Sequence, residues 1–134
     1  MNYIDIITEA IDEANINWKQ VSEDTISMYC PCDTPPVIQV LLHFKDINLN
    51  NYMFLARILP MDETNPDALS LCNNLNREYG KIKFYIEDNY IFCQLDTYFD
   101  RAKCAQESLL NLLGFIHVIK ACYPKIAKVS LDID

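Results

Sequence analysis

The stretch NPDALSLCNNLNREYGKIKFYIEDNYIFCQLDTY, from Asn65 to Tyr98, predicts a capped helix followed by a tight hairpin. Asn65 is a favourable N-cap, and Pro66 suits the first helical position, where an N–H would have no partner in the helix. Gly80 stands where a left-handed cap is expected to end the helix. Between these signals runs one apolar stripe with helical spacing, formed by Ala68, Leu71, Cys72, Leu75 and Tyr79.

The hairpin is expected to turn at Asp88-Asn89, because both residues tolerate a positive φ. This turn fixes the strand register and gives one wholly apolar face, which pairs Ile82, Phe84 and Ile86 with Leu95, Cys93 and Ile91. On the other face Tyr85 lies opposite Phe92, among polar and charged side chains. Two interpretations of this aromatic pair are open: an ordinary cross-strand pair that stabilises the sheet, or part of a surface that binds a partner.

The rest of the chain adds helices and strands around this unit. Residues 3–15 predict an amphipathic helix, residues 18–21 a short extended segment, and residues 25–30, 37–44 and 52–60 three strands. A long apolar helix is expected from Asp100 or Arg101 to about Tyr123, where Pro124 stops it. The last residues, AKVSLDID, fit either a short edge strand or a loose tail.

The order α-β-β-β-α-β-β-α predicts an α+β fold, in which an antiparallel five-stranded sheet is backed by helices. A chain of 134 residues is expected to form a single domain, residues 1–134.

The composition argues against several kinds of partner. With a formal net charge of −8 and a pI near 4.6, the chain is repelled by nucleic acid and by anionic membranes, so a basic or apolar polypeptide is the better partner. The apolar run 109–122 is too short and too interrupted to span a bilayer. The acidic N-terminus lacks a signal-peptide pattern, so we expect a cytoplasmic protein whose six cysteines are free thiols.

No motif for catalysis, metal binding or a nucleotide cofactor stands out. Two glycines 34 positions apart cannot form the glycine-rich phosphate loops. Cys30 and Cys32 are the only closely spaced cysteines, and they lack the further ligands that a zinc site needs. His43 and His117 have no nucleophile or carboxylate placed by a motif to work with them. We therefore expect no catalytic residue, no metal and no cofactor.

The strands and the last helix carry more apolar surface than one sheet face and one helix stripe require. Both faces of the strands at 37–44 and 52–60 are apolar, which suggests that something covers the second face. We assign a partner-binding surface to Val37, Leu41, Tyr85 and Phe92. The surplus apolar arc of the last helix suggests self-association, for which Leu112, Phe115 and Ile119 are the candidate dimer contacts.

The core stretch resembles the YbjN family of bacterial proteins. The resemblance is carried by a helix ending in Leu75-Asn76-Arg77, the strand Lys83-Phe84-Tyr85-Ile86, a tight turn and the paired strand Tyr90 to Leu95; the helix that closes near Tyr123-Pro124 fits as well. The resemblance implies sensory-transduction regulators with a fold similar to that of the class I type III secretion chaperones. Those chaperones are acidic, dimeric proteins that hold an extended segment of a client chain.

Taken together, the residues and the resemblance favour a non-enzymatic, dimeric protein-binding module, chaperone-like or regulatory, that holds a client polypeptide on apolar sheet surface. The alternative is a small-ligand or metal-responsive regulator, with a pocket between sheet and helix or a soft metal on Cys30 and Cys32. A third hypothesis, an enzyme of an unrecognised type, requires a deep pocket that brings His43 or His117 to a carboxylate.

Overall fold

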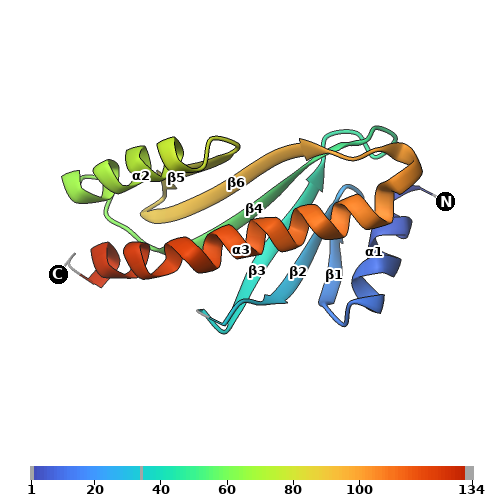
Figure 1. Ribbon diagram of the computed structural model, residues 1–134, viewed down its shortest axis with the longest axis horizontal. Helices are drawn as coiled ribbons and strands as arrows, with labels where there is room; N and C mark the ends of the chain where they lie inside the picture. Colours follow the sequence, from blue (N-terminus) through green and yellow to red (C-terminus); the bar gives the residue numbers. More distant parts are fainter. Residues whose placement is uncertain (1, 34, 132–134) are drawn as a thin grey trace.

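A computed structural model describes residues 2–33 and 35–131 and confirms an α+β fold with an antiparallel sheet. Figure 1 shows the long helix α3 crossing in front of the sheet, with α1 and α2 towards its two ends. The elements in chain order are α1 (Tyr3–Glu13), β1 (Asn17–Ser22), β2 (Thr25–Pro31), β3 (Val37–Phe44), β4 (Asn51–Pro60), α2 (Pro66–Glu78), β5 (Ile82–Glu87), β6 (Tyr90–Tyr98), the 3₁₀ turn η1 (Arg101–Lys103) and α3 (Cys104–Leu131).

The sheet has six strands where the sequence predicted five, in the order β1-β2-β3-β4-β6-β5. The additional strand is β1, which pairs with β2 from Asn17 opposite Tyr29 to Ser22 opposite Thr25. It was predicted only as a short extended segment because five of its six residues are exposed, so no apolar alternation marks it. An edge strand can form on backbone hydrogen bonds to its neighbour without that pattern.

The central helix and hairpin form largely as predicted. The Asn65 side chain caps α2 by accepting a hydrogen bond from the Asp67 amide at 2.9 Å. Asp88 and Asn89 have φ values of 51° and 61°, and the strand pairing has the expected register. The role assigned to Gly80 was wrong: its φ is not positive, and α2 ends at Glu78, with the Tyr79 amide donating to the Leu75 carbonyl at 2.8 Å.

The last helix continues beyond the proline that was expected to end it. Pro124 lies inside α3, which runs to Leu131, so most of the predicted edge strand or tail is helical; residues 132–134 lie outside the described residues. Ile126 is fully buried, and the Ser130 hydroxyl donates to the Pro60 carbonyl at 2.7 Å. These tertiary contacts offset the hydrogen bond and the close packing that a proline removes from a helix interior.

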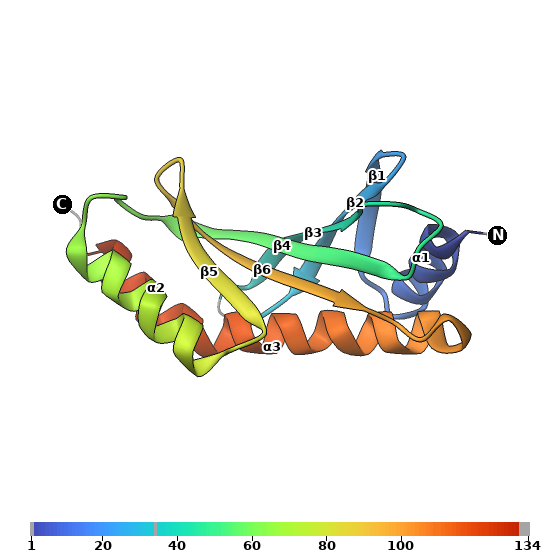
Figure 2. The same cartoon turned by 90° about the horizontal axis from the view of Figure 1, so that it is seen from above.

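The core lies between the helices and one face of the sheet. Figure 2 shows α1 and α3 on one side of the strands and α2 beside the β5 edge. Phe54 of β4 stacks on Phe115 of α3 with ring centroids 5.8 Å apart, and Phe99 packs edge-on against both Tyr3 and Tyr52. The buried apolar strand residues therefore lie on the helix side of the sheet, and the opposite face carries no helix within the described residues; Ser27 of β2 is buried on that opposite face.

Candidate functional site: the uncovered face of the sheet

The uncovered face is the side of the sheet that points away from α1 and α3. Strand pairing places one set of alternating residues on it: Thr25, Ser27 and Tyr29 of β2, Val37, Gln39, Leu41 and His43 of β3, Met53, Leu55 and Arg57 of β4, Lys83 and Tyr85 of β5, and Tyr90, Phe92, Gln94 and Asp96 of β6. Leu41, Leu55 and Phe92 are half-buried although no helix lies over them. They bury part of their apolar surface against one another and leave the rest to solvent.

A shallow depression lies at the centre of the uncovered face. It encloses about 280 Å³ and is lined by Gln39, Leu41, Leu55, Arg57 and Phe92. The strand register brings these residues together, because Leu41 lies opposite Leu55 and Arg57 lies opposite Phe92. An apolar floor with a few polar groups at the rim is a common lining for a site that binds apolar groups. This depression has room for side chains of a partner.

Aromatic rings extend the depression along β6. Tyr85 stacks on Phe92 with ring centroids 5.6 Å apart and an interplanar angle of 12°, and the Tyr85 hydroxyl donates to Gln94 Oε1 at 3.0 Å. The Arg57 guanidinium lies over the Tyr90 ring, 4.4 Å from its centroid. Among the ion pairs of the described residues Arg57 makes none, so its charge remains able to pair with an acidic group of a partner.

The structure brings together most, but not all, of the predicted partner-binding residues. Leu41 and Phe92 line the depression, and Tyr85 stacks beside it. Val37 lies on the same face and is 56 % exposed, but it stands at the end of β3, outside the lining. Leu55 and Arg57 were not predicted as site residues. Their strand alternation is visible in the sequence, but their position beside Leu41 and Phe92 depends on which strands are neighbours.

The two edge strands of the sheet, β5 and β1, differ in whether other parts of the chain occupy their outward backbone groups. At the β5 edge the Asn76 side chain accepts a hydrogen bond from the Phe84 amide at 2.6 Å and donates one to the Phe84 carbonyl at 3.0 Å. The Ile82 amide donates to the Tyr79 carbonyl at 3.1 Å. No backbone hydrogen bond to β1 from an element other than β2 occurs in the described part of the chain. The β1 edge is therefore the more open of the two.

The three residues assigned to a dimer contact are not on the surface. Leu112, Phe115 and Ile119 are 1 %, 1 % and 0 % exposed, because they form the stripe of α3 that packs on the sheet. A second copy cannot reach these side chains in the folded chain. The large apolar residues that α3 does expose within the described chain are Leu110 and Leu113. The helix has the surplus apolar arc that the sequence indicated, but on other residues.

The cysteine pair and the histidines are not gathered into a metal site among the described residues, although His43 Nδ1 lies 3.7 Å from Asp24 Oδ1. Cys30 and Cys32 are buried, and burial raises the pKa of the Cys30 thiol to about 12, which disfavours the thiolate that binds metals. No three His, Cys, Asp or Glu side chains within residues 2–33 and 35–131 are placed to hold a metal ion. His43 Nδ1 lies 2.9 Å from the Thr25 hydroxyl on the uncovered face, while His117 is exposed on α3.

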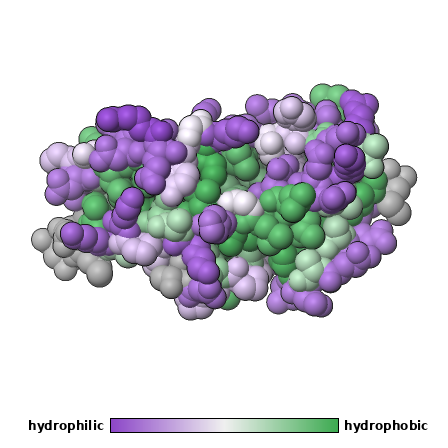
Figure 3. Space-filling model, viewed as in Figure 1, coloured by the Kyte–Doolittle hydropathy of each residue, from purple (hydrophilic) through white to green (hydrophobic). Residues whose placement is uncertain are grey.

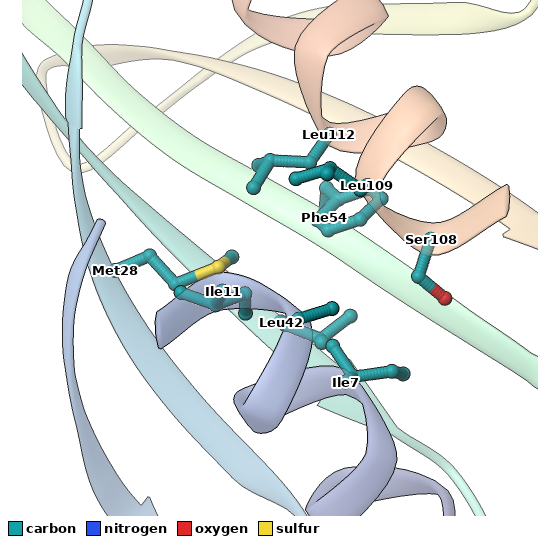
Figure 4. Close-up of a pocket in the computed structure, with 9 residues that line it drawn as sticks. Ile7, Ile11, Met28, Leu42, Phe54, Ser108, Leu109 and Leu112 are labelled. Carbon is teal, nitrogen blue, oxygen red and sulfur yellow. The ribbon is translucent and has the colours of Figure 1, made fainter. Parts of the chain in front are cut away.

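The space between the helices and the sheet is too small for a ligand. Figure 4 shows apolar side chains from α1, the sheet and α3 converging around it, including Ile7, Met28, Leu42 and Leu112. The cavity encloses about 10 Å³, which is at the lower limit for a single water molecule. Ser108 of α3 also lines this space. The pocket required by the small-ligand alternative is therefore not found here.

Comparison with known proteins supports the fold. No protein-family model and no curated protein matches the sequence. A chain in the crystal structure of the ExsC–ExsE complex is similar with a TM-score of 0.58 and 13 % identity, over 87 % of this chain and 90 % of that chain. YbjN from E. coli has a TM-score of 0.48 and 15 % identity, over 88 % of this chain and 91 % of that chain. At 13 % identity, the likeness to the chain of the ExsC–ExsE complex shows a shared fold.

Proposed function

We propose that this chain is a non-enzymatic protein-binding module that holds an extended segment of another polypeptide against the uncovered face. The observation that carries the proposal is the depression of about 280 Å³ on a sheet face without helices, with Leu41, Leu55 and Phe92 on its floor. A fold shared with a chain of the ExsC–ExsE complex, itself an assembly of two proteins, supports the same conclusion.

The chemistry of the depression favours a polypeptide that combines apolar and acidic residues. Apolar side chains of the segment would displace water from Leu41, Leu55 and Phe92. A carboxylate beside them would pair with the Arg57 guanidinium, which already lies over Tyr90. Nucleic acid is a poor alternative, because the chain carries a net charge of −8.

The β1 edge offers a second contact for the same segment. An extended peptide can add a strand to an open edge through backbone hydrogen bonds. The β5 edge is less suitable, because Asn76 already occupies the outward amide and carbonyl of Phe84. We propose that strand addition, where the client uses it, takes place at β1, and that the module acts as a homodimer.

To test this function, peptides are selected from a displayed library on the immobilised full chain. The dissociation constants of the selected peptides are then measured for the wild type and for purified variants. Leu55→Gln and Phe92→Gln place polar groups on the floor of the depression. Leu69→Gln is the control, because Leu69 is a leucine of α2 that is 50 % exposed and does not line the depression. We expect each floor variant to weaken binding roughly tenfold or more and the control to leave it unchanged.

Chemical-shift mapping of the selected peptide onto the labelled protein gives an independent result. Perturbed amides in β3, β4 and β6 are expected. A library that yields no binder, or binders whose affinity falls only with Leu69→Gln, contradicts the proposed function.

A further inference from the structure

One row of residues crosses the whole uncovered face at right angles to the strands. Residues that pair directly opposite each other in an antiparallel sheet point to the same side of it. The pairings run without a break from one edge strand to the other, through Lys19, Ser27, Leu41, Leu55, Gln94 and Lys83. This set is called the central row below. Its two leucines belong to the floor of the depression, and both of its ends are lysines.

Among the described residues, the lysines at the two ends of the central row have no acidic partner. Lys19 of β1 and Lys83 of β5 are exposed, and neither belongs to an ion pair. Asp96 of β6 lies in the next row on the same face and accepts a hydrogen bond from Gln94 Nε2 at 2.9 Å. The net charge of −8 favours a basic partner for the chain as a whole. The central row, with Arg57 beside it, instead offers positive charge to an acidic partner.

The polar residues between the two lysines already have partners within the chain. Ser27 is buried, and its hydroxyl accepts a hydrogen bond from the Gln39 side chain at 2.8 Å. Gln94 Oε1 accepts one from the Tyr85 hydroxyl at 3.0 Å. A partner that lies along the central row can therefore gain contact with the apolar surface of its two leucines and with its two ammonium groups.

The length of the central row sets the length of the segment that fits it. The strand order gives five steps from β1 to β5. Neighbouring strands lie about 4.8 Å apart, so the two ends of the row are roughly 24 Å apart. An extended chain advances about 3.3 Å per residue and points alternate side chains to the same side, so residues about six or eight positions apart reach both lysines. The strands fan out from β1 to β6 in Figure 1, and the segment turns with them.

We infer that the client segment crosses the strands along the central row. An acidic side chain at each end pairs with Lys19 and Lys83, and apolar side chains between them cover the two leucines. This inference rests on the proposed function and adds the direction, the length and the residue pattern of the client. The row ends at β1, the open edge, so a client that continues beyond Lys19 reaches the edge where a strand can be added.

The helix side of the molecule also exposes apolar surface. Figure 3, in which α3 faces the viewer as in Figure 1, shows this surface over the middle of the molecule with polar surface around it. Leu110 and Leu113 of α3 are 60 % and 49 % exposed. Leu41 and Leu55, in contrast, are half-buried and line a depression, where a side chain of a partner buries more of its surface than on an exposed helix. We therefore place the client on the central row.

Peptide selection on two forms of the full chain tests the inference. A displayed library is selected on the wild type and on the double variant Lys19→Glu with Lys83→Glu. Both lysines are exposed, so the substitutions are compatible with the fold, and circular dichroism checks this. Peptides selected on the wild type are expected to carry acidic residues about six or eight positions apart around an apolar centre. Peptides selected on the double variant are expected to carry basic residues at those positions.

The dissociation constants of one peptide selected on the wild type give the size of the effect. Lys19→Glu and Lys83→Glu are each expected to weaken its binding roughly threefold to tenfold, because repulsion replaces an exposed ion pair. Lys128→Glu is the matched control, because it changes the net charge equally but lies on α3, on the other side of the sheet. This control is expected to change binding less than about twofold. A peptide with lysines in place of its acidic residues is expected to bind the double variant again.

The outcomes separate this inference from the proposed function. A selection that yields no peptide on either chain contradicts the proposed function itself. The same peptide sequences on both chains, or acidic residues without a preferred spacing, overturn the inference and leave the proposed function in place. A labelled thymidine oligonucleotide that binds the wild type more tightly than any selected peptide, and does not bind the double variant, would assign the lysines to a nucleic-acid backbone and overturn the inference as well.

Discussion

The Asn76 side chain holds both backbone polar groups of Phe84, accepting from its amide at 2.6 Å and donating to its carbonyl at 3.0 Å. Asn76 lies on α2 and Phe84 lies on β5, so the amide side chain takes the place that a further strand would occupy. Unpaired backbone groups at a sheet edge are a template for aggregation, and natural proteins cover such edges. This contact therefore closes one end of the sheet and leaves β1 as the open edge.

Replacing Asn76 by alanine is expected to lower the free energy of unfolding by about 1–3 kcal/mol, because it leaves the Phe84 amide and carbonyl without partners. Denaturant unfolding measures the loss. Asn74→Ala is the matched control, because Asn74 is an exposed residue of the same helix. This substitution gives the same gain in helix propensity but removes no hydrogen bond to Phe84. Equal changes in the two variants would mean that the Asn76 contact contributes nothing to stability.

The contact between the stacked rings of Tyr85 and Phe92 is expected to stabilise the sheet by about 0.5–1.5 kcal/mol, in addition to what each ring contributes through its own burial. A double-mutant cycle with Tyr85→Ala, Phe92→Ala and the combined variant measures this coupling energy. The value distinguishes the two interpretations of the pair that the sequence left open. A coupling energy near zero would show that the pair adds nothing to the fold, and the rings would then be explained by partner binding alone.

Ile126→Ala is expected to lower the free energy of unfolding by about 2–5 kcal/mol, because Ile126 is fully buried in the part of α3 that follows Pro124. Lys128→Ala, two residues further along and exposed, is the control and is expected to have an effect within about 0.5 kcal/mol. If the two variants were equally stable, the end of α3 would not be packed on the rest of the chain.

Local patterns predicted the elements whose signals lie within a few residues. The N-cap at Asn65, the turn at Asp88-Asn89 and the pairing of Phe84 with Cys93 all follow from neighbouring residues, and the structure confirms them. The α+β class follows from element order and is confirmed as well.

The predictions that failed depended on contacts between distant parts of the chain. Pro124 ends an isolated helix, but here Ile126 and the hydrogen bond from Ser130 to Pro60 keep the following turn helical. The strand β1 has no apolar alternation of its own and forms on the edge that β2 offers.

Only part of the candidate site was predictable, because some of its residues carry a local pattern and others depend on contacts between distant strands. Leu41 and Phe92 carry a visible strand pattern, whereas Arg57 joins them only because β4 lies between β3 and β6. The apolar excess of α3 was visible in the sequence, but which of its residues face the sheet was not. That choice depends on the rotation of the helix about its axis, which is set by packing against Phe54 and its neighbours.

The buried thiols predict how stability changes with pH. Burial raises the pKa of Cys30 from 9.0 to about 12, and burial also raises the pKa of Cys93. In the unfolded chain these thiols lose their protons as the pH passes about 9, while the folded chain still holds them, so the unfolded state is favoured by deprotonation. The contribution of these two thiols to the free energy of unfolding is therefore expected to stay constant below about pH 8. It is expected to fall as the pH rises from 9 towards 12.

Urea unfolding of the wild type and of Cys30→Ala at a series of pH values isolates the effect, because tyrosines and lysines titrate equally in both proteins. Each buried thiol contributes a slope of up to about 1.4 kcal/mol per pH unit, so the stability of the variant is expected to fall less steeply with pH than that of the wild type. The difference in unfolding free energy between the two proteins at neutral pH measures the packing lost with the sulfur atom. It does not affect how steeply the unfolding free energy changes with pH. Parallel curves for the two proteins above pH 9 would show that the Cys30 thiol titrates at the same pH whether the chain is folded or unfolded, which is incompatible with its burial in β2.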